Sequence, residues 1–422
     1  MTAILLIVGI LILLVLRFNV IMALALPALI YFVAEDVPVS IFALRAFAGV
    51  DEFTLVAIPL FVLVGAMLQA SRVLNDLIAV LRKGLARFRS GLVLANVFDS
   101  AAFSGISGSA AADVATLGPI SIPLMKRAGY PASYAAAVTA ATSIVGPIIP
   151  PSIVFIFYGA IADVPIPDLF LAGVVPGLLL VLSFALLVVV QSRRFASPAI
   201  DSSTVSLSNW IGTLVVVGMG AFIILSIASG LATVTESAGI ASASAVVFAL
   251  ARLRVAFPKA FVGELVRAGR LSMDVLLLIA VSNVLAWIFT IEGVSQGLGA
   301  ILGHNTGDRY TFFAIVIGAM LFVGIFLDTF PAIVLTVPVI TPVADSLGVS
   351  PIQTGVVVVL SLMVGAVHPP VGVCLYMSCR IADASVWEAF FHIIPFILAV
   401  LAVLAVVATV PSLTTFLPAV LG

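Results

Sequence analysis

The chain has 422 residues, of which 63% are hydrophobic and only 9% are charged. Soluble domains carry roughly a quarter charged residues, so this composition excludes a soluble globular protein and predicts a polytopic protein of the lipid bilayer. The formal net charge of −1 excludes nucleic acid as a partner, and two cysteines are too few for a disulfide framework.

Six long apolar segments are expected to cross the bilayer as helices, because a span needs about 20 apolar residues. They are Phe53–Ala70, Leu169–Val190, Trp210–Ser229, Leu231–Leu250, Leu271–Ile291 and Ala389–Val410. The residues before position 36 form either one kinked span or a tight pair interrupted at Arg17–Asn19, and the sequence leaves both open.

Three further segments combine apolar character with polar side chains and helix breakers: Val93–Lys126, Ala132–Ile161 and Phe312–Leu347. Proline removes a backbone donor and interrupts a helix. Broken backbone is tolerated inside a membrane only where it is buried in protein or lines a cavity. These segments are therefore expected to lie within the protein rather than against lipid.

The distribution of basic residues predicts the topology. Basic side chains between Arg72 and Arg89 precede the first polar segment, and Lys126–Arg127 end it. By the positive-inside rule both ends are cytoplasmic, so this segment is a re-entrant hairpin and not a span. The segment Phe312–Leu347, which follows Glu292, is expected to form a second hairpin that enters from outside.

The two halves of the chain align at a constant offset, which pairs Gly105 with Gly324 and Pro151 with Pro370. Seven glycines and prolines between Gly105 and Pro151 match glycines and prolines in the second half, where composition alone predicts roughly 0.4 matches. Because the hairpins enter from opposite sides, the repeat is inverted. Inverted repeats with broken helices at corresponding positions are typical of secondary transporters, which bind substrate and ions near the midplane.

The predicted fold class is an all-α polytopic membrane protein with an inverted structural repeat, two re-entrant helical hairpins and broken transmembrane helices. The expected divisions are N-terminal spans (1–52), a first repeat (53–190) with a hairpin at 91–127, central scaffold spans with a cytoplasmic amphipathic stretch (191–270), and a second repeat (271–422) with a hairpin at 311–347. The amphipathic stretches Leu74–Phe88 and Phe257–Arg270 are expected to belong to the scaffold.

Several motifs resemble those of the large membrane (M) subunit, DctM-like, of the TRAP family, the tripartite ATP-independent periplasmic transporters. In the first half they are Ser104-Gly-Ile-Ser-Gly-Ser109 with Asp113, Gly118 and Ile122-Pro123, then Gly146-Pro-Ile-Ile-Pro-Pro-Ser152 with Tyr158-Gly159. In the second half they are Leu327-Asp-Thr329 with Pro331, and Pro369-Pro-Val-Gly372. The resemblance covers nearly the whole chain, with departures at Ala110, Ser361 and His368.

The resemblance implies an elevator-type, sodium-coupled importer of an organic anion such as a carboxylate, located in the bacterial inner membrane. It implies two protein partners, a small membrane (Q) subunit and a periplasmic substrate-binding (P) subunit. It implies Na⁺ as the coupling ion at two sites, no organic cofactor and no enzymatic activity.

Two sodium sites are expected where each hairpin turn faces a helix break, because sodium prefers oxygen ligands such as hydroxyls and freed carbonyls. The candidate ligands of the first site are Ser104, Ser107, Gly146, Ile149 and Pro150. The candidate ligands of the second site are Gly324, Asp328, Gly365, His368 and Val371. Serine and glycine also permit close helix packing with no ion bound, but their recurrence in both halves favours cation sites.

Candidate substrate-binding residues lie at the same turns. They are Ser107, Gly108, Ser109, Asp113, Asp328 and Thr329. A carboxylate at membrane depth costs roughly 2.5–3.5 kcal/mol on insertion scales, which makes Asp113 and Asp328 functional candidates. For Asp328 a helix N-cap is an equal alternative, and for Asp113 a structural brace of the hairpin is favoured.

Two other functions stay open from the sequence alone. Gly105-Ile-Ser107-Gly108 also suits the nucleophile turn of an intramembrane serine protease, for which only His368 lies plausibly at the depth of Ser107. His368 itself is expected to be a neutral hydrogen-bond partner rather than a proton carrier. A stand-alone sodium–dicarboxylate symporter of the same architecture is the nearer alternative, and it would need no binding protein.

Overall fold

A computed structural model describes residues 2–16, 18–191, 205–253, 257–294, 308–369 and 372–421. Within these ranges the side chains of residues 2–4, 15, 104–106, 257–258 and 260 are not described. The described residues form helices and connecting turns, with no strand among them. Eight of these helices are long and apolar enough to cross a membrane, which confirms the all-α polytopic fold class.

The N-terminal residues form a packed pair of helices, which resolves the alternative left open by the sequence. Helix α1 (Thr2–Val15) and helix α2 (Val20–Ala34) lie against each other. Asn19 separates them, because its side chain accepts a hydrogen bond from the Ile21 N–H at 2.9 Å and caps α2. A further helix, α3 (Val39–Val50), was not predicted.

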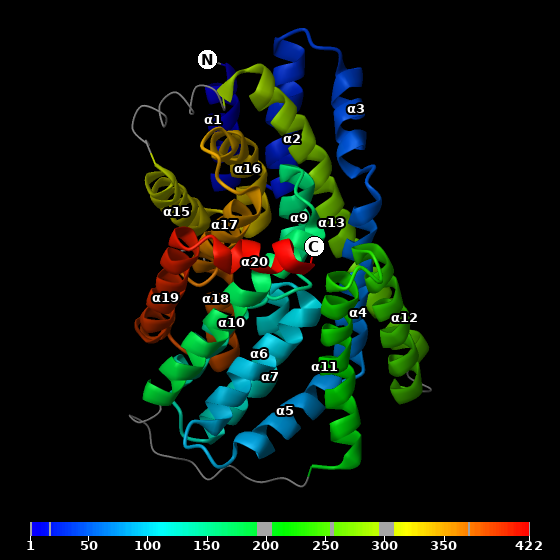
Figure 1. Ribbon diagram of the computed structural model, residues 1–422, viewed down its shortest axis with the longest axis vertical. Helices are drawn as coiled ribbons and strands as arrows, with labels where there is room; N and C mark the ends of the chain where they lie inside the picture. The colour runs from blue at the N-terminus through cyan, green and yellow to red at the C-terminus, as the bar shows by residue number, and fades with distance from the viewer. Residues whose placement is uncertain are drawn as a thin grey trace.

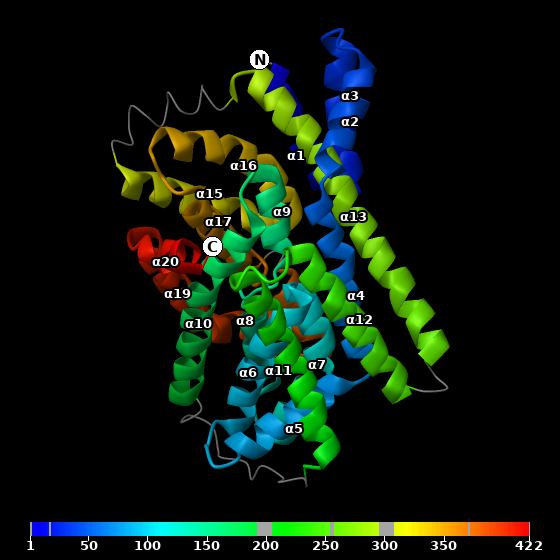
Figure 2. The same cartoon turned by 45° about the vertical axis from the view of Figure 1, so that its right-hand side comes forward.

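A group of long helices stands at one side of the molecule (Figure 1). It consists of the short helix η1 (Phe53–Val56) with α4 (Ala57–Ala70), α11 (Leu207–Ala228), α12 (Val234–Leu253) and α13 (Phe257–Ile291). Helix α13 is continuous over 35 residues, so the amphipathic stretch Phe257–Arg270 and the span that follows it are one helix and not two elements. Figure 2 shows α13 running beside α4 along the edge of the molecule.

Helix α5 (Val73–Leu85) is the amphipathic helix expected near residues 74–88. It lies across one end of the molecule in both views and packs between α11 and α6 (Figures 1 and 2). Asp76 of α5 forms an ion pair with Arg252 of α12 and accepts a hydrogen bond from Asn209 Nδ2 at 2.8 Å. These contacts attach α5 to the long helices.

The two repeats have matching helices. The first repeat contains α6 (Gly91–Ser107), α7 (Ala110–Arg127), α8 (Ala132–Ser143), α9 (Ile153–Ala162) and α10 (Ile166–Gln191). The second contains α15 (Arg309–Phe326), α16 (Thr329–Ser346), α17 (Pro351–Gly365), α18 (Val373–Ala382) and α19 (Val386–Thr409), followed by α20 (Ser412–Leu421), which was not predicted. Matching helices agree in length, since α7 and α16 each have 18 residues and α9 and α18 each have 10 residues.

The hairpins α6–α7 and α15–α16 lie toward opposite ends of the molecule in both views (Figures 1 and 2). The broken helices α8–α9 and α17–α18 run between them. Each half packs on the other, because α18 contacts α7 and α8, and α16 contacts α9. Phe157 of α9 and Phe330 of α16 meet edge to face with ring centroids 5.0 Å apart.

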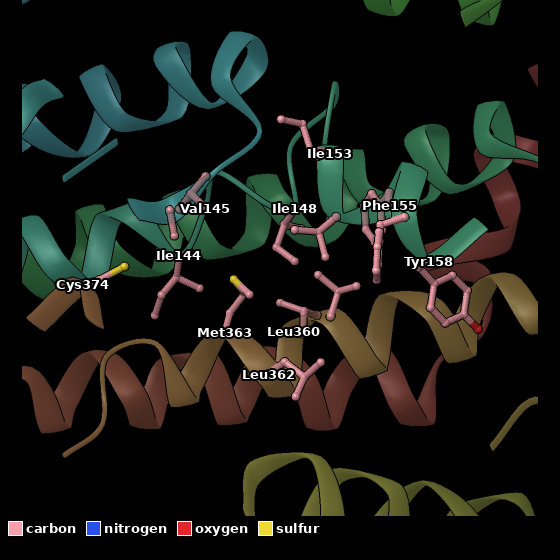
Figure 3. Close-up of a cluster of buried hydrophobic side chains, with 14 of the residues drawn as sticks. Ile144, Val145, Ile148, Ile153, Phe155, Tyr158, Leu360, Leu362, Met363 and Cys374 are labelled. Carbon is pink, nitrogen blue, oxygen red and sulfur yellow. The ribbon is translucent and has the colours of Figure 1, made fainter. Parts of the chain in front are cut away.

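One part of the buried core lies between the break after α8 and helix α17 (Figure 3). Ile144, Val145 and Ile148 at the break after α8 lie close to Leu360 and Met363 of α17 in this view, and the two side chains from α17 are no more than 1% exposed. In lipid the close packing of such side chains, rather than exclusion of water, holds helices together. The break after α8 is therefore embedded in protein, as the sequence predicted.

Candidate functional site

The turn of the first hairpin rests directly on the break between α8 and α9. Gly108 has φ +56°, which favours glycine, and a Cβ atom placed on it would lie 2.7 Å from the Ile153 nitrogen and 2.8 Å from the Pro151 carbonyl oxygen. A Cβ atom on Gly146 would lie 3.4 Å from the Ser109 carbonyl carbon. The two chain segments therefore meet backbone to backbone.

Polar groups of the first predicted sodium site gather at this contact. Ser107 is 7% exposed, and its Oγ has no hydrogen-bond partner among the described residues. Pro150 is buried in the break, whereas the Ile149 side chain packs toward Gly177 of α10, so Ile149 offers only its backbone oxygen. Ser104 belongs to α6, but its side chain lies outside the described part of the structure.

Serine side chains also shape the ends of the two helices at the first contact. Ser109 caps α7, since its Oγ accepts a hydrogen bond from the Ala112 N–H at 3.4 Å. Ser152 accepts from the Phe155 N–H at 3.1 Å and donates to the Pro147 carbonyl oxygen at 2.6 Å, which ties together both sides of the break. These hydrogen bonds explain why polar residues lie on both sides of the helix break that the prolines cause.

The second hairpin repeats this arrangement at even closer range. A Cβ atom placed on Gly365, at the end of α17, would overlap the Gly324 carbonyl group in α15. A Cβ atom on Gly324 would lie 3.3 Å from the Leu362 carbonyl oxygen. Gly324 and Gly365, both predicted in the second sodium site, are thus in direct backbone contact.

The other predicted site residues of the second half differ in their surroundings. Asp328 is exposed and caps α16, because its Oδ1 accepts a hydrogen bond from the Thr329 N–H at 2.8 Å. Thr329 is buried. His368 contacts the Pro369 carbonyl oxygen through Nδ1 and packs edge to face on Phe390, with ring centroids 5.2 Å apart. Val371 lies outside the described residues.

A cavity of about 110 Å³ opens between the first hairpin turn and the long helices. Ser107 and Ser109 line its hairpin side, and Gln69 of α4 lies on the other side with Glu264 and Arg267 of α13. Arg267 Nη1 lies 3.1 Å from Glu264 Oε2, and the Arg267 side chain is 68% exposed. The cavity therefore combines hydroxyl groups, an amide, a carboxylate and a guanidinium, and the guanidinium is the group in this set that could bind an anion.

Asp113 does not line this cavity. It is 1% exposed, and its Oδ2 accepts a hydrogen bond from Ser100 Oγ of α6 at 2.8 Å. Ser100 Oγ also lies 3.0 Å from Thr142 Oγ1 of α8. Asp113 thus joins α7 to α6 and, through Ser100, to α8, which is the bracing position considered for it from the sequence.

The sequence analysis did not single out several polar residues that the fold brings to this region. They are Gln69, Glu264 and Arg267 at the cavity, and Asn96, Asp99, Ser100, Thr139 and Thr142 behind the hairpin turn. Asp99 and Ser100 lie three and four residues after Asn96 on the apolar helix α6, and this spacing is a signal that could have identified them. The cavity residues come from distant helices and carry no local signal.

Comparison with known proteins identifies the family. The family model of the DctM component of tripartite ATP-independent periplasmic transporters matches residues 7–413. The chain belongs to this family. It is 30% identical over 393 residues to the C4-dicarboxylate TRAP transporter large permease protein DctM of Pseudomonas aeruginosa, with 90% of each chain covered. It is 29% identical over 378 residues to the sialic acid TRAP transporter large permease protein SiaM of Vibrio cholerae, covering 89% of this chain and 88% of that one.

A solved structure supports the fold. The Alcanivorax borkumensis YdaH transporter, whose crystal structure has an unusual topology, superposes with a TM-score of 0.57 at 18% identity and covers 84% of this chain and 85% of that one. Membership in the DctM family confirms a transport subunit of a TRAP system rather than an enzyme, so the protease alternative is wrong. Together with the eight apolar helices it places the chain in the bacterial inner membrane as a multi-pass protein.

Proposed function

We propose that this DctM-family chain is the transport subunit of a sodium-coupled importer of an organic anion, which a periplasmic binding protein delivers. The observation that carries the proposal is one close backbone contact between a hairpin and a broken helix in each half, at Gly108 with Pro151 and at Gly324 of α15 with Gly365. One such contact in each half of an inverted repeat provides two places where backbone oxygens could converge.

Sodium binding at the first contact is supported by the chemistry of the residues there. Ser107 Oγ is buried without a hydrogen-bond partner among the described residues, and an unsatisfied buried hydroxyl costs free energy unless a ligand occupies it. Backbone oxygens of the Gly146–Pro150 break lie on the facing segment. A sodium ion bound between them would hold the hairpin turn against the break.

An organic anion is supported by the cavity beside the same turn. Arg267 offers a guanidinium that can bind a carboxylate through two parallel hydrogen bonds. In the present structure Arg267 is paired with Glu264 on the same helix, so a bound anion would displace this carboxylate or share the guanidinium with it. The relatives named for C4-dicarboxylates and for sialic acid both transport carboxylates, and we extend this chemical class to the present chain.

The sodium part of the proposal is tested with uptake by reconstituted vesicles. Ser107→Ala removes one cation ligand, and the loss of a hydrogen-bond-strength contact of about 1 kcal/mol should raise the sodium concentration for half-maximal uptake about fivefold. Ser183→Ala is the matched control, because the Ser183 hydroxyl donates to the Leu179 carbonyl within α10 and does not line the cavity at the first hairpin turn. Unchanged sodium dependence in Ser107→Ala would remove this residue from the site.

The partner requirement is tested by reconstitution with defined components. The proposed partners are a small membrane (Q) subunit and a periplasmic (P) binding protein, so vesicles that lack the binding protein should transport little. Full-rate uptake by this chain alone would instead establish the stand-alone sodium–dicarboxylate symporter. The substrate itself is best identified from a ligand screen on the binding protein.

A further inference from the structure

A groove of about 400 Å³ runs between helices α1 and α2, apart from the site described above. Only residues 16–19 separate the two helices, so the helices run antiparallel. Gly9 faces Pro27 across the groove, and a Cβ atom placed on Gly9 would lie 3.8 Å from the Pro27 ring. The missing side chain of Gly9 therefore leaves space between the helices, and the volume is in the range of about 300–1,000 Å³ that small-molecule sites occupy.

The groove opens to the surface of the protein along its length. Leu5, Ile12 and Ile30 line it, and each of these side chains is more than half exposed. Exposed apolar side chains on the helices of a bilayer protein face lipid, so an acyl chain fits the groove better than water does. Lipid tails are as apolar as leucine, so the apolar walls do not distinguish one lipid from another. Selectivity has to come from the polar groups at one end.

Those polar groups lie together where α2 ends. Tyr31 donates a hydrogen bond from its hydroxyl to Glu292 Oε1, just after α13, at 3.0 Å. Glu35 follows the last residue of α2 and is exposed. The other end of the groove is lined by Leu13 and Leu26. One end is thus acidic and the other apolar, which matches the shape of an amphiphile.

The charge at the polar end is negative. Glu35 is the one charged side chain among the described residues that line the groove. Residues 18–44 contain no lysine or arginine. The next basic residue, Arg45, lies over the ring of Trp287 and does not line the groove. An anionic headgroup would therefore meet repulsion here, whereas an ammonium group could form charge-assisted hydrogen bonds with the carboxylate.

The position of the groove indicates which leaflet supplies the lipid. Helices α1 and α2 lie toward the end of the molecule opposite to α5 in both views (Figures 1 and 2). The basic residues of α5 belong to the stretch that the positive-inside rule places in the cytoplasm. The acidic end of the groove therefore faces the periplasmic leaflet.

We propose that the groove between α1 and α2 binds one acyl chain of a periplasmic-leaflet phospholipid whose headgroup carries an ammonium group, with Glu35 as the partner of the ammonium. The acyl chain lies along Gly9 and Pro27 toward the apolar end. The inference concerns the first two helices alone, and it holds whether or not sodium drives transport.

Native mass spectrometry of the full-length chain tests the proposal. The detergent-solubilised protein is mixed with phosphatidylethanolamine or phosphatidylglycerol of identical acyl chains, and the bound lipids are counted. The wild type should bind phosphatidylethanolamine about fivefold more tightly, the contribution expected of one exposed ion pair. Glu35→Gln should remove this preference. Gly9→Leu fills the groove and should retain one lipid fewer than the wild type.

Matched controls make the same changes outside the groove. Glu52→Gln removes an exposed carboxylate that caps no backbone group, and Gly218→Leu adds the same side chain to α11 where a Cβ atom meets nothing within 4 Å. Both should behave as the wild type. Equal binding of the two lipids to the wild type, or an unchanged lipid count in Gly9→Leu, would overturn the proposal. Loss of the bound lipid on adding the small membrane subunit would also overturn it and identify the groove as a subunit interface.

Discussion

Gly365 and Gly324 touch so closely that no side chain fits between them. A Cβ atom on Gly365 would overlap the Gly324 carbonyl group and lie 2.7 Å from the Gly324 Cα. The second hairpin therefore rests on the break after α17 through main-chain atoms. Backbone contact of this kind leaves carbonyl oxygens available to a cation, and it makes the fold sensitive to a single methyl group.

Gly365→Ala should consequently destabilise the protein. Overpacking typically costs about 1–3 kcal/mol, and the upper end is expected here because the obstructing atoms are backbone and cannot rotate away. The midpoint of thermal unfolding of the detergent-solubilised chain measures the effect. Gly318→Ala in the same α15 is the control, since a Cβ atom there meets nothing within 4 Å. Equal midpoints for the two variants would contradict the close contact.

Arg267→Gln should weaken substrate binding without removing sodium dependence. Hydrogen bonds to charged groups contribute about 1.5–3 kcal/mol, so the apparent KM for the anion should rise at least about tenfold. The control is Arg270→Gln, which removes the same charge from α13 at a position that does not line the cavity. If both variants raise KM equally, the effect is general electrostatic attraction and Arg267 has no specific contact with the anion.

The ion pair between Asp76 and Arg252 should contribute to stability through the attachment of α5. Breaking a buried ion pair costs up to about 3–5 kcal/mol, and a smaller value of about 2 kcal/mol is expected because Arg252 is 30% exposed. Asp76→Asn and Arg252→Gln should each lower the unfolding midpoint. The double variant should lose less than the sum of the two, because either change alone already breaks the pair. Strict additivity would show that the two side chains act independently.

The hairpins could be predicted closely from the sequence. The positions of glycines and prolines, together with the flanking charges, predicted the hairpins at 91–127 and 311–347. In the structure α6–α7 spans 91–127 and α15–α16 spans 309–346. These signals are local, because proline interrupts a helix wherever it packs. Helices α3 and α20 were missed, since an apolar run of 10–12 residues is too short to predict as a span.

The candidate site was predictable only in part. Motif residues such as Gly146 and Gly365 carry their own signal, and the fold brings each to a hairpin turn. Arg267 appeared in the sequence as one basic residue of a cytoplasmic stretch. Its position beside Ser107 follows from α13 continuing without a break past Arg270 and packing on α4. Which residues of two distant helices face each other depends on tertiary packing, and a single sequence carries no pattern that reveals it.

His368 provides the last prediction, which concerns the coupling ion. Its ring packs on Phe390 and its Nδ1 contacts the adjacent Pro369 carbonyl oxygen, so both contacts lie within its own half of the chain. His368→Thr, which removes the imidazole, should therefore keep sodium-driven uptake. The lost ring contact should cost about 0.5–1.5 kcal/mol of stability. Uptake is measured in vesicles with a sodium gradient or a proton gradient imposed separately.

The two gradients separate the possible roles of His368. Backbone oxygens at Gly324 and Gly365 remain in His368→Thr, so the second sodium site should survive, and the sodium concentration for half-maximal uptake should change little. Phe390→Leu is the control, because it removes the same ring contact while leaving the imidazole. Uptake driven by a proton gradient in the wild type, lost in His368→Thr but kept in Phe390→Leu, would show that His368 carries a coupled proton. That outcome would replace sodium-only coupling, because one half of the repeat would then move a proton where the other half moves sodium.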